Sequence, residues 1–379
     1  MTGGESSADM RGRSSNVLAC LTELFKEIIM KKGFRKILEY VCVFAAILLN
    51  MPISAVAAQE GTTILNTPPH YELRERVGRN NSVIKTYTKE TTTQAAGLSP
   101  MAIEETKSIL LDLGLSLESI NHMSDEKLEH YANASQIFSV TSFMIVKPDG
   151  ETIYTTENVV LEKAERVNQQ IADMFKSYAT NSNEVVADLN DRDGALELNA
   201  IISHTGNGHY LYDLEATWHS MPAFRYVDSL GAVAEVCSVV NNTRNGNYTY
   251  TTVYADATGT RTETETEYLY GNSDFRNDEK GEWSGTAALI YLPTDSVTPD
   301  GSYTRMVTTL TANVSFVTRV TYPNEETNFN VVATYSHSTV NLSPSIDISY
   351  PGGISASIGL GLGADECYVQ TDRPISYVP

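Results

Sequence analysis

The 379-residue sequence is poor in positive charge. It holds 27 Lys and Arg against 47 Asp and Glu, which gives a formal net charge of −20 at pH 7 with neutral histidines. A surface of that sign repels the phosphate backbone of nucleic acids. The shortage of basic residues therefore argues against nucleic acid as a partner.

Cysteines and long hydrophobic runs are also scarce. Four cysteines in a chain of this length exclude a disulfide-rich scaffold. The apolar stretch from Tyr40 to Leu49 is shorter than the about 20 residues that a membrane-spanning helix needs. We therefore expect no permanent membrane anchor in the mature form.

This short apolar stretch is part of a predicted secretion signal. Four basic residues precede it: Lys31, Lys32, Arg35 and Lys36. The small residues Ala55-Val56-Ala57 follow it. A basic segment, a short apolar segment and a small-residue cleavage site are typical of a secretory signal peptide. The sequence predicts a signal peptide over residues 30–58, cleavage after Ala57 or Ala58, and a secreted, extracellular protein.

Residues 1–29 do not belong to such a signal, which normally begins at the N-terminus. Translation from Met30 would give it a normal beginning, and Lys26-Glu27 can be encoded as a bacterial ribosome-binding sequence. We expect residues 1–29 to be a misassigned start. Removal of residues 1–58 leaves Cys237 and Cys367, which could form a disulfide in an exported protein or remain two buried thiols.

The fold class predicted for the rest of the chain is α+β. Residues 59–97 are polar and Thr-rich, which predicts a linker, and residues 98–187 carry helix signals and a hairpin around Pro148-Asp149-Gly150. A helix with one buried stripe is predicted from apolar residues at spacings of three and four: Val160, Ala164, Val167, Ile171, Met174 and Tyr178.

Residues 188–379 predict a mainly antiparallel, β-sandwich-like domain. Short alternating strands are separated by turn signals such as Gly206-Asn207-Gly208, and no repeat of fixed length points to a propeller. In one strand Glu263, Glu265 and Glu267 share a face, which favours an exposed position at the edge of a sheet.

The run from Ala216 to Gly231 holds the most conspicuous side chains. Pro222 interrupts the strand pattern, so we interpret the run as a corner between two strands. Four residues are expected to hold it: Trp218, Pro222, Arg225 and Asp228. His219 and Asp228 are also the weak candidates for a catalytic pair, which would need an unidentified partner.

The sequence pattern Trp-x-x-Met-Pro-x-x-Arg-x-x-Asp, from Trp218 to Asp228, resembles a pattern found in uncharacterised exported proteins of Gram-positive bacteria. The helical stretch "SDEKLEHYANA" from Ser124 is similar as well. The resemblance implies an exported protein of a Gram-positive bacterium, and no activity comes with it.

A calcium site is the one cofactor that the residues suggest. Its candidate oxygen ligands surround a glycine turn: Asp188, Asn190, Asp191 and Asp193. Arg192 occupies a position where a helix–loop–helix calcium loop needs oxygen, and Asp and Asn before Gly are also ordinary turn residues.

The function expected from these observations is a non-catalytic one, the binding of an unknown extracellular or cell-wall ligand. One alternative is a bacteriocin-like or pore-forming exoprotein, because residues 353–364 alternate apolar and small residues as a membrane-crossing strand does. A half-buried strand in a soluble domain shows the same pattern. The other alternative is a secreted calcium-dependent hydrolase.

Overall fold

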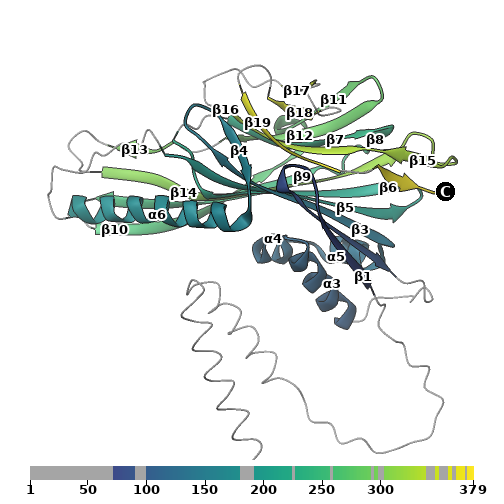
Figure 1. The fold of residues 1–379 in the computed structure, drawn as a ribbon, viewed down its shortest axis with the longest axis horizontal. Coiled ribbons are helices and arrows are strands. Elements are labelled where there is room, and N and C mark those ends of the chain that lie inside the picture. The colour runs from purple at the N-terminus through teal and green to yellow at the C-terminus, as the bar shows by residue number, and fades with distance from the viewer. Residues whose placement is uncertain are drawn as a thin grey trace, which may run out of the picture. The chain divides into compact units, whose positions relative to one another are not determined.

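The computed structural model describes residues 71–89, 100–179, 192–223, 227–256, 259–291, 294–297, 303–338, 346–349, 357–360, 364–371 and 374–379. The predicted signal peptide lies outside these ranges. The described chain is mainly antiparallel β-structure with a few helices (Figure 1), so the predicted β-rich character is confirmed. Among the described helices, none has the length and apolar content to cross a bilayer.

The larger sheet contains the longest strands. Its order is β1 (Tyr71–Val77), β2 (Val83–Lys89), β3 (Gln136–Val146), β5 (Gly194–Gly206), β6 (His209–Ser220), β14 (Tyr303–Val320), β9 (Asn245–Asp256) and β10 (Gly259–Leu269). Three short strands pair at its margins: β4 (Thr152–Thr155) with β3, and β8 (Cys237–Val239) and β13 (Ser296–Val297) with β14. The predicted hairpin around Pro148-Asp149-Gly150 is formed by β3 and β4.

The smaller sheet lies against one face of the larger one (Figure 1). Its order is β11 (Phe275–Lys280), β12 (Trp283–Tyr291), β7 (Val227–Glu235), β16 (Val331–Ser338) and β19 (Ala364–Gln370). One hydrophobic core takes alternate residues from both sheets, among them Leu214 of β6, Leu230 of β7 and Tyr335 of β16. Two further strand pairs are β15 (Thr327–Phe329) with β20 (Ile375–Tyr377), and β17 (Ile346–Ser349) with β18 (Ser357–Leu360).

Helices pack on the opposite face of the larger sheet. α3 (Pro100–Asp112), α4 (Leu117–Asn121) and α5 (Asp125–Asn133) form a second core with Ile137, Ile201 and Leu211 of that sheet. The predicted amphipathic helix is α6 (Glu157–Ala179), whose apolar stripe contacts Ala255 and Met306. The one-turn elements are η1 (Arg79–Asn81) and α7 (Gly271–Asp274).

Two predicted boundaries are wrong. The linker expected over residues 59–97 contains a hairpin, because β1 and β2 pair along their length and β2 continues onto β3. The boundary expected between residues 187 and 188 does not separate two folding units, because β3 pairs with β5 from Ile137 to Val146. Residues Thr67–Pro379 instead form one compact unit.

Candidate functional site

The Trp218 run carries the chain from the larger sheet to the smaller one. β6 ends at Ser220 and β7 begins at Val227, so the change of sheet falls across Met221 and Pro222. Trp218 is fully buried, and its Nε1 donates to the Tyr335 hydroxyl at 2.8 Å. Tyr335 in turn donates to Asp228, and His337 Nδ1 lies 2.9 Å from Asp228 Oδ1.

These four side chains form a buried network between the two sheets. Burial raises the pKa of Tyr335 well above its usual range, and the Asp228 carboxylate beside it adds to the rise. The phenol therefore stays protonated and can donate to the carboxylate. Asp228 is thus a structural acceptor in the core.

The corner is held by Arg192, which comes from a distant part of the sequence. Its Nη2 donates to the Pro222 carbonyl at 3.1 Å and to Asp295 Oδ2 at 3.0 Å. Arg225, the residue expected in this role, lies outside the described residues. Gly194 completes the packing, because a Cβ there would overlap the Trp218 ring and lie 3.0 Å from Pro222 Cδ.

The suggested catalytic pair is not assembled. His219 Nε2 lies 2.9 Å from Glu197 Oε2 on the larger sheet. Trp218 reaches the network around Asp228, and the next residue of a strand points to the opposite face. His219 therefore lies beside Glu197 on one face of the larger sheet, while Asp228 belongs to the core on the other face.

The two cysteines are separate buried thiols, so the disulfide alternative is wrong. Cys237 pairs with Val320 in the larger sheet, whereas Cys367 pairs with Tyr335 in the smaller one. Burial raises the pKa of Cys237 to about 12, so its thiol is unreactive at neutral pH.

The calcium candidates are described only in part. Asp193 forms an ion pair with Lys163 of α6, while Asp188, Asn190 and Asp191 lie outside the described residues. Within the part of the chain that the structure describes, no three His, Cys, Asp or Glu side chains gather as a metal site.

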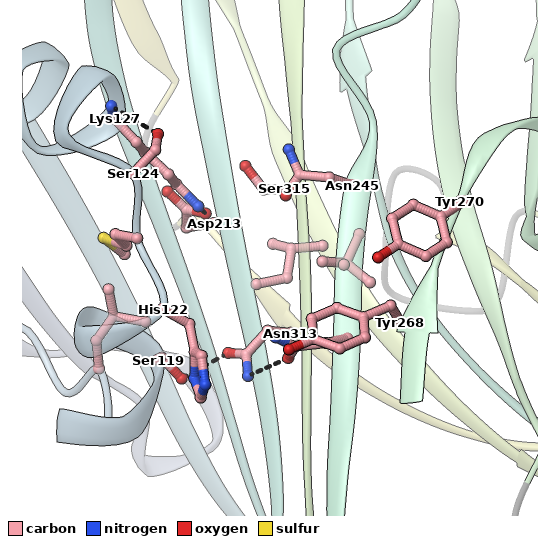
Figure 2. A pocket seen from close by; sticks show the side chains of 16 residues that line it. Ser119, His122, Ser124, Lys127, Asp213, Asn245, Tyr268, Tyr270, Asn313 and Ser315 are labelled. Atoms are coloured by element: carbon pink, nitrogen blue, oxygen red, sulfur yellow. Dashed lines mark hydrogen bonds and ion pairs between the residues drawn. The ribbon is translucent and has the colours of Figure 1, made fainter. Parts of the chain in front are cut away.

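A pocket of about 380 Å³ with both polar and apolar lining residues lies between the helices and the larger sheet (Figure 2). We call it the helix–sheet pocket. Ser119 of α4 and Lys127 of α5 line one side, and Tyr268 of β10 and Tyr270 line the other. Between them lie polar residues of three strands: Asp213 of β6, Asn245 and Asn247 of β9, and Asn313 and Ser315 of β14.

Hydrogen bonds hold the floor of this pocket. Asp213 forms an ion pair with Lys127 and accepts a hydrogen bond from the Tyr131 hydroxyl. Asn313 Nδ2 donates to Asn247 Oδ1 at 3.3 Å, and the Ser119 hydroxyl donates to Asn313 Oδ1 at 2.8 Å. The side chains are therefore fixed before any ligand arrives.

A buried carboxylate lies beside the pocket. Glu215 accepts from the backbone N–H of Ser116 at 3.1 Å and from its hydroxyl at 2.9 Å, and it competes with Asn313 Oδ1 for the single proton of the Ser119 hydroxyl. Burial raises the pKa of Glu215 to about 7, although the serine hydrogen bonds lower it. Its proton is therefore exchanged near neutral pH.

The hairpin of β17 and β18 lies on the outer face of the smaller sheet, against β7 and β16. Ile348 is 2% exposed and packs with Val233, Trp283 and Val332. In the pairing of the two strands, Ile348 is opposite Ile358 and Ile346 is opposite Leu360. Within the described residues the two strands form ladder hydrogen bonds with each other alone.

The surface under this hairpin is polar in part. Ser229 of β7 and Thr334 and Ser336 of β16 lie on the same outer face as Val233 and Val332, by strand alternation. All three hydroxyls are buried, and none has a hydrogen-bond partner among the described residues.

The register of β17 and β18 reveals a pattern that sequence reasoning missed. Only the arm over residues 353–364 was recognised as alternating. The sequence also alternates before Pro351, with apolar residues Val340, Leu342, Ile346, Ile348 and Tyr350. Between them stand Asn341, Ser343, Ser345, Asp347 and Ser349, and Pro344 interrupts the apolar series.

No protein-family model matches the chain, and no curated protein matches it. Solved structures give weak likenesses. One described as "Pore forming protein" is 11% identical with a TM-score of 0.18, covering 47% of this chain and 85% of that one. The membrane-inserted NetB toxin of Clostridium perfringens is 8% identical with a TM-score of 0.15, covering 47% and 89%.

The macrocyclisation enzyme AvmM of alchivemycin A biosynthesis is similar at the same level. It is 11% identical with a TM-score of 0.19, and the match covers 42% of this chain and 79% of the enzyme. TM-scores this low establish no common fold, so neither toxin nor enzyme chemistry carries over to this chain.

Proposed function

We propose that this chain is an exported, non-enzymatic protein that acts on membranes by inserting residues 340–364. The register of β17 and β18 carries the proposal, because it pairs Ile346 with Leu360 and Ile348 with Ile358. Each alternating arm has the length of a membrane-crossing strand, which needs about 9–11 residues. Apolar residues would face lipid, while the serine and glycine positions would face water.

Detachment of the hairpin from the smaller sheet is inexpensive in hydrogen bonds. Its described strands pair with each other and would keep those bonds. Among the described contacts that detachment would break are the packing of Ile348 and two bonds of its backbone: its N–H donates to Asp278 Oδ2 at 2.6 Å, and its carbonyl accepts from Lys280 Nζ at 3.2 Å. Detachment would also return Ser229, Thr334 and Ser336 to water.

A single hairpin cannot satisfy its outer backbone groups in lipid. Copies of the chain would therefore have to pair side by side, so that each edge finds a partner. The proposal accordingly includes secretion after cleavage near Ala57 or Ala58, a sandwich-like body of two sheets that stays outside the bilayer, and an oligomeric inserted state.

Dye release from liposomes tests the proposal. Purified protein is added to vesicles of zwitterionic, anionic and sterol-containing composition between pH 5 and 8, and we expect release from at least one composition. Ile358→Lys places a charge on the lipid-facing side and should abolish release, while Ser357→Lys on the adjacent, water-facing side is the matched control. Circular dichroism verifies that both variants are folded.

A second measurement does not require the protein to tolerate an introduced charge. Single cysteines at residues 354–362, labelled with an environment-sensitive dye, should shift to the blue in liposomes at even-numbered positions and remain unshifted at odd ones. Absence of release in every composition, together with unshifted dyes at all positions, would overturn membrane insertion.

A second candidate function is the binding of an extracellular or cell-wall ligand without action on membranes. The helix–sheet pocket favours it, because fixed polar side chains and exposed aromatic rings meet there. Retained ligand binding by a protein that releases no dye would select this candidate.

A further inference from the structure

The helix–sheet pocket has the components of a carbohydrate site. Tyr268 and Tyr270 are 52% and 65% exposed, and their rings lie nearly parallel, with centroids 6.0 Å apart and 22° between planes. Figure 2 shows both rings on one side of the pocket, across from Ser119 and His122. The two rings form one exposed aromatic surface, and their electron-rich faces attract the weakly positive C–H groups of a sugar ring.

The polar lining matches hydroxyl groups. Asn245, Asn247 and Asn313 each offer an amide with donors and an acceptor side by side, and Ser315 adds a hydroxyl. A sugar hydroxyl is itself both donor and acceptor, so it can bridge the two halves of an amide. Because Asn313 is already held by Asn247 and Ser119, little side-chain entropy is lost when a ligand binds.

The charges of the lining select a neutral ligand. Lys127 is paired with Asp213, and Asp213 also accepts from Tyr131, so the one lysine of the lining has its charge compensated. The whole chain carries a formal charge of −20, which opposes phosphorylated, sulfated or acidic sugars. The volume of about 380 Å³ lies at the lower end of the range for small-ligand sites, which suits one or two sugar rings.

We propose that the helix–sheet pocket binds the terminal sugars of a neutral glycan. The inference rests on the pocket as a binding site and not on membrane insertion. The helices and the β17–β18 hairpin lie on opposite sides of the two sheets, so a bound glycan would leave the hairpin uncovered.

An array of immobilised oligosaccharides tests this inference. Fluorescently labelled protein is applied to neutral hexose and N-acetylhexosamine glycans and, alongside them, to sialylated, sulfated and phosphorylated ones. We expect binding to at least one neutral structure, with little change between low and high salt, because no net charge is paired. Binding to no glycan, or only to acidic glycans with a strong salt dependence, would overturn the inference.

Variants locate the binding. Tyr268→Ala and Asn313→Ala should each lower the affinity for the best neutral glycan of the array about tenfold or more, as measured by calorimetric titration. Tyr322→Ala is the matched control, since Tyr322 is 53% exposed and does not line the pocket. Equal affinity of Tyr268→Ala and the unaltered protein would place the glycan elsewhere and contradict the assignment.

A separate readout keeps this inference distinct from membrane insertion. Tyr268→Ala should leave dye release from glycan-free liposomes unchanged, whereas Ile358→Lys should abolish release and leave glycan affinity unchanged. Loss of both properties in Tyr268→Ala would contradict the independence of the pocket from the hairpin.

Discussion

Strands β7 and β16 carry two kinds of buried polar side chain, one on each face of the smaller sheet. On the inner face Asp228 accepts hydrogen bonds from Tyr335, which also receives the Trp218 indole N–H. On the outer face the hydroxyls of Ser229 and Thr334 are buried without a partner among the described residues. Hydrogen bonds between buried side chains fix one arrangement of a core, whereas hydroxyls without a partner each cost about 1–3 kcal/mol for as long as they stay covered.

The hydrogen-bonded inner face and the unpartnered hydroxyls of the outer face differ in the direction that the proposed detachment of the hairpin requires. The four predictions that follow begin with the inner face, pass to the side of the larger sheet covered by helices, and end with the outer face.

The largest effect is expected from Trp218→Ala. It removes a fully buried indole from between the sheets and leaves the Tyr335 hydroxyl without its donor, so the free energy of unfolding should fall by about 3–5 kcal/mol. Urea denaturation followed by circular dichroism measures the change. A loss below about 1 kcal/mol would contradict a stabilising role of the hydrogen-bonded inner face.

Gly194→Ala should also destabilise the inner face, by about 1–3 kcal/mol. The added methyl group overlaps the Trp218 ring and presses on Pro222. The double variant Gly194→Ala with Trp218→Phe should recover part of the loss, because a smaller ring makes room for the methyl group. Additive losses in the double variant would show that the two residues do not interact.

Glu215, on the face of the larger sheet covered by helices, predicts a pH dependence. Burial raises its pKa to about 7, above the value of 4.5 for a free carboxyl, so the folded protein binds the proton more tightly than the unfolded chain. Its contribution to stability is therefore fully present below pH 4.5 and lost as the pH rises through about 7. Glu215→Gln should flatten this dependence, as thermal unfolding between pH 4 and 9 would reveal.

The flattening is expected to be on the order of 1–3 kcal/mol across that range. Glu129→Gln is the control, because Glu129 is exposed on α5, one of the helices that cover the same face of the sheet. An identical pH profile for Glu215→Gln and the unaltered protein would mean that Glu215 titrates at its ordinary value.

The smallest effect is expected on the outer face. Ser229→Ala and Thr334→Val each remove a buried hydroxyl that has no described partner, so each should stabilise the protein by up to about 1 kcal/mol. Both should slow dye release, because less is gained when the hairpin leaves. Urea denaturation measures the change in stability, and the rate of dye release measures the change in release. Destabilisation by either variant would contradict the difference between the two faces.

Local patterns predicted much of the fold. The helix over residues 160–178 followed from the spacing of Val160, Ala164 and Val167, and the β3–β4 hairpin followed from its turn. The β1–β2 hairpin did not, because β1 is rich in charged residues and the surrounding segment is polar. Its pairing with β3 depends on residues far along the chain.

The candidate sites depend even more on distant contacts. The prediction grouped Asp228 with residues of the same short run, whereas its partners in the structure, Tyr335 and His337, lie more than a hundred positions away. The helix–sheet pocket brings Ser119 to Asn313 across 194 positions of the sequence, so no spacing between nearby residues predicts it. The alternation before Pro351 could have been found in the sequence, but Pro344 interrupts it.

The larger sheet ends, within its described order, at β10, whose backbone edge has no neighbour there. Glu263 and Glu267 on this strand are exposed, and Glu265 between them accepts from the Tyr250 hydroxyl at 2.9 Å. Two molecules that met through β10 would bring both rows of carboxylates together, which opposes fibre-like growth of the sheet at neutral pH. Storage in acid or concentrated salt removes this protection, so a stock of the protein should keep longest in dilute neutral buffer.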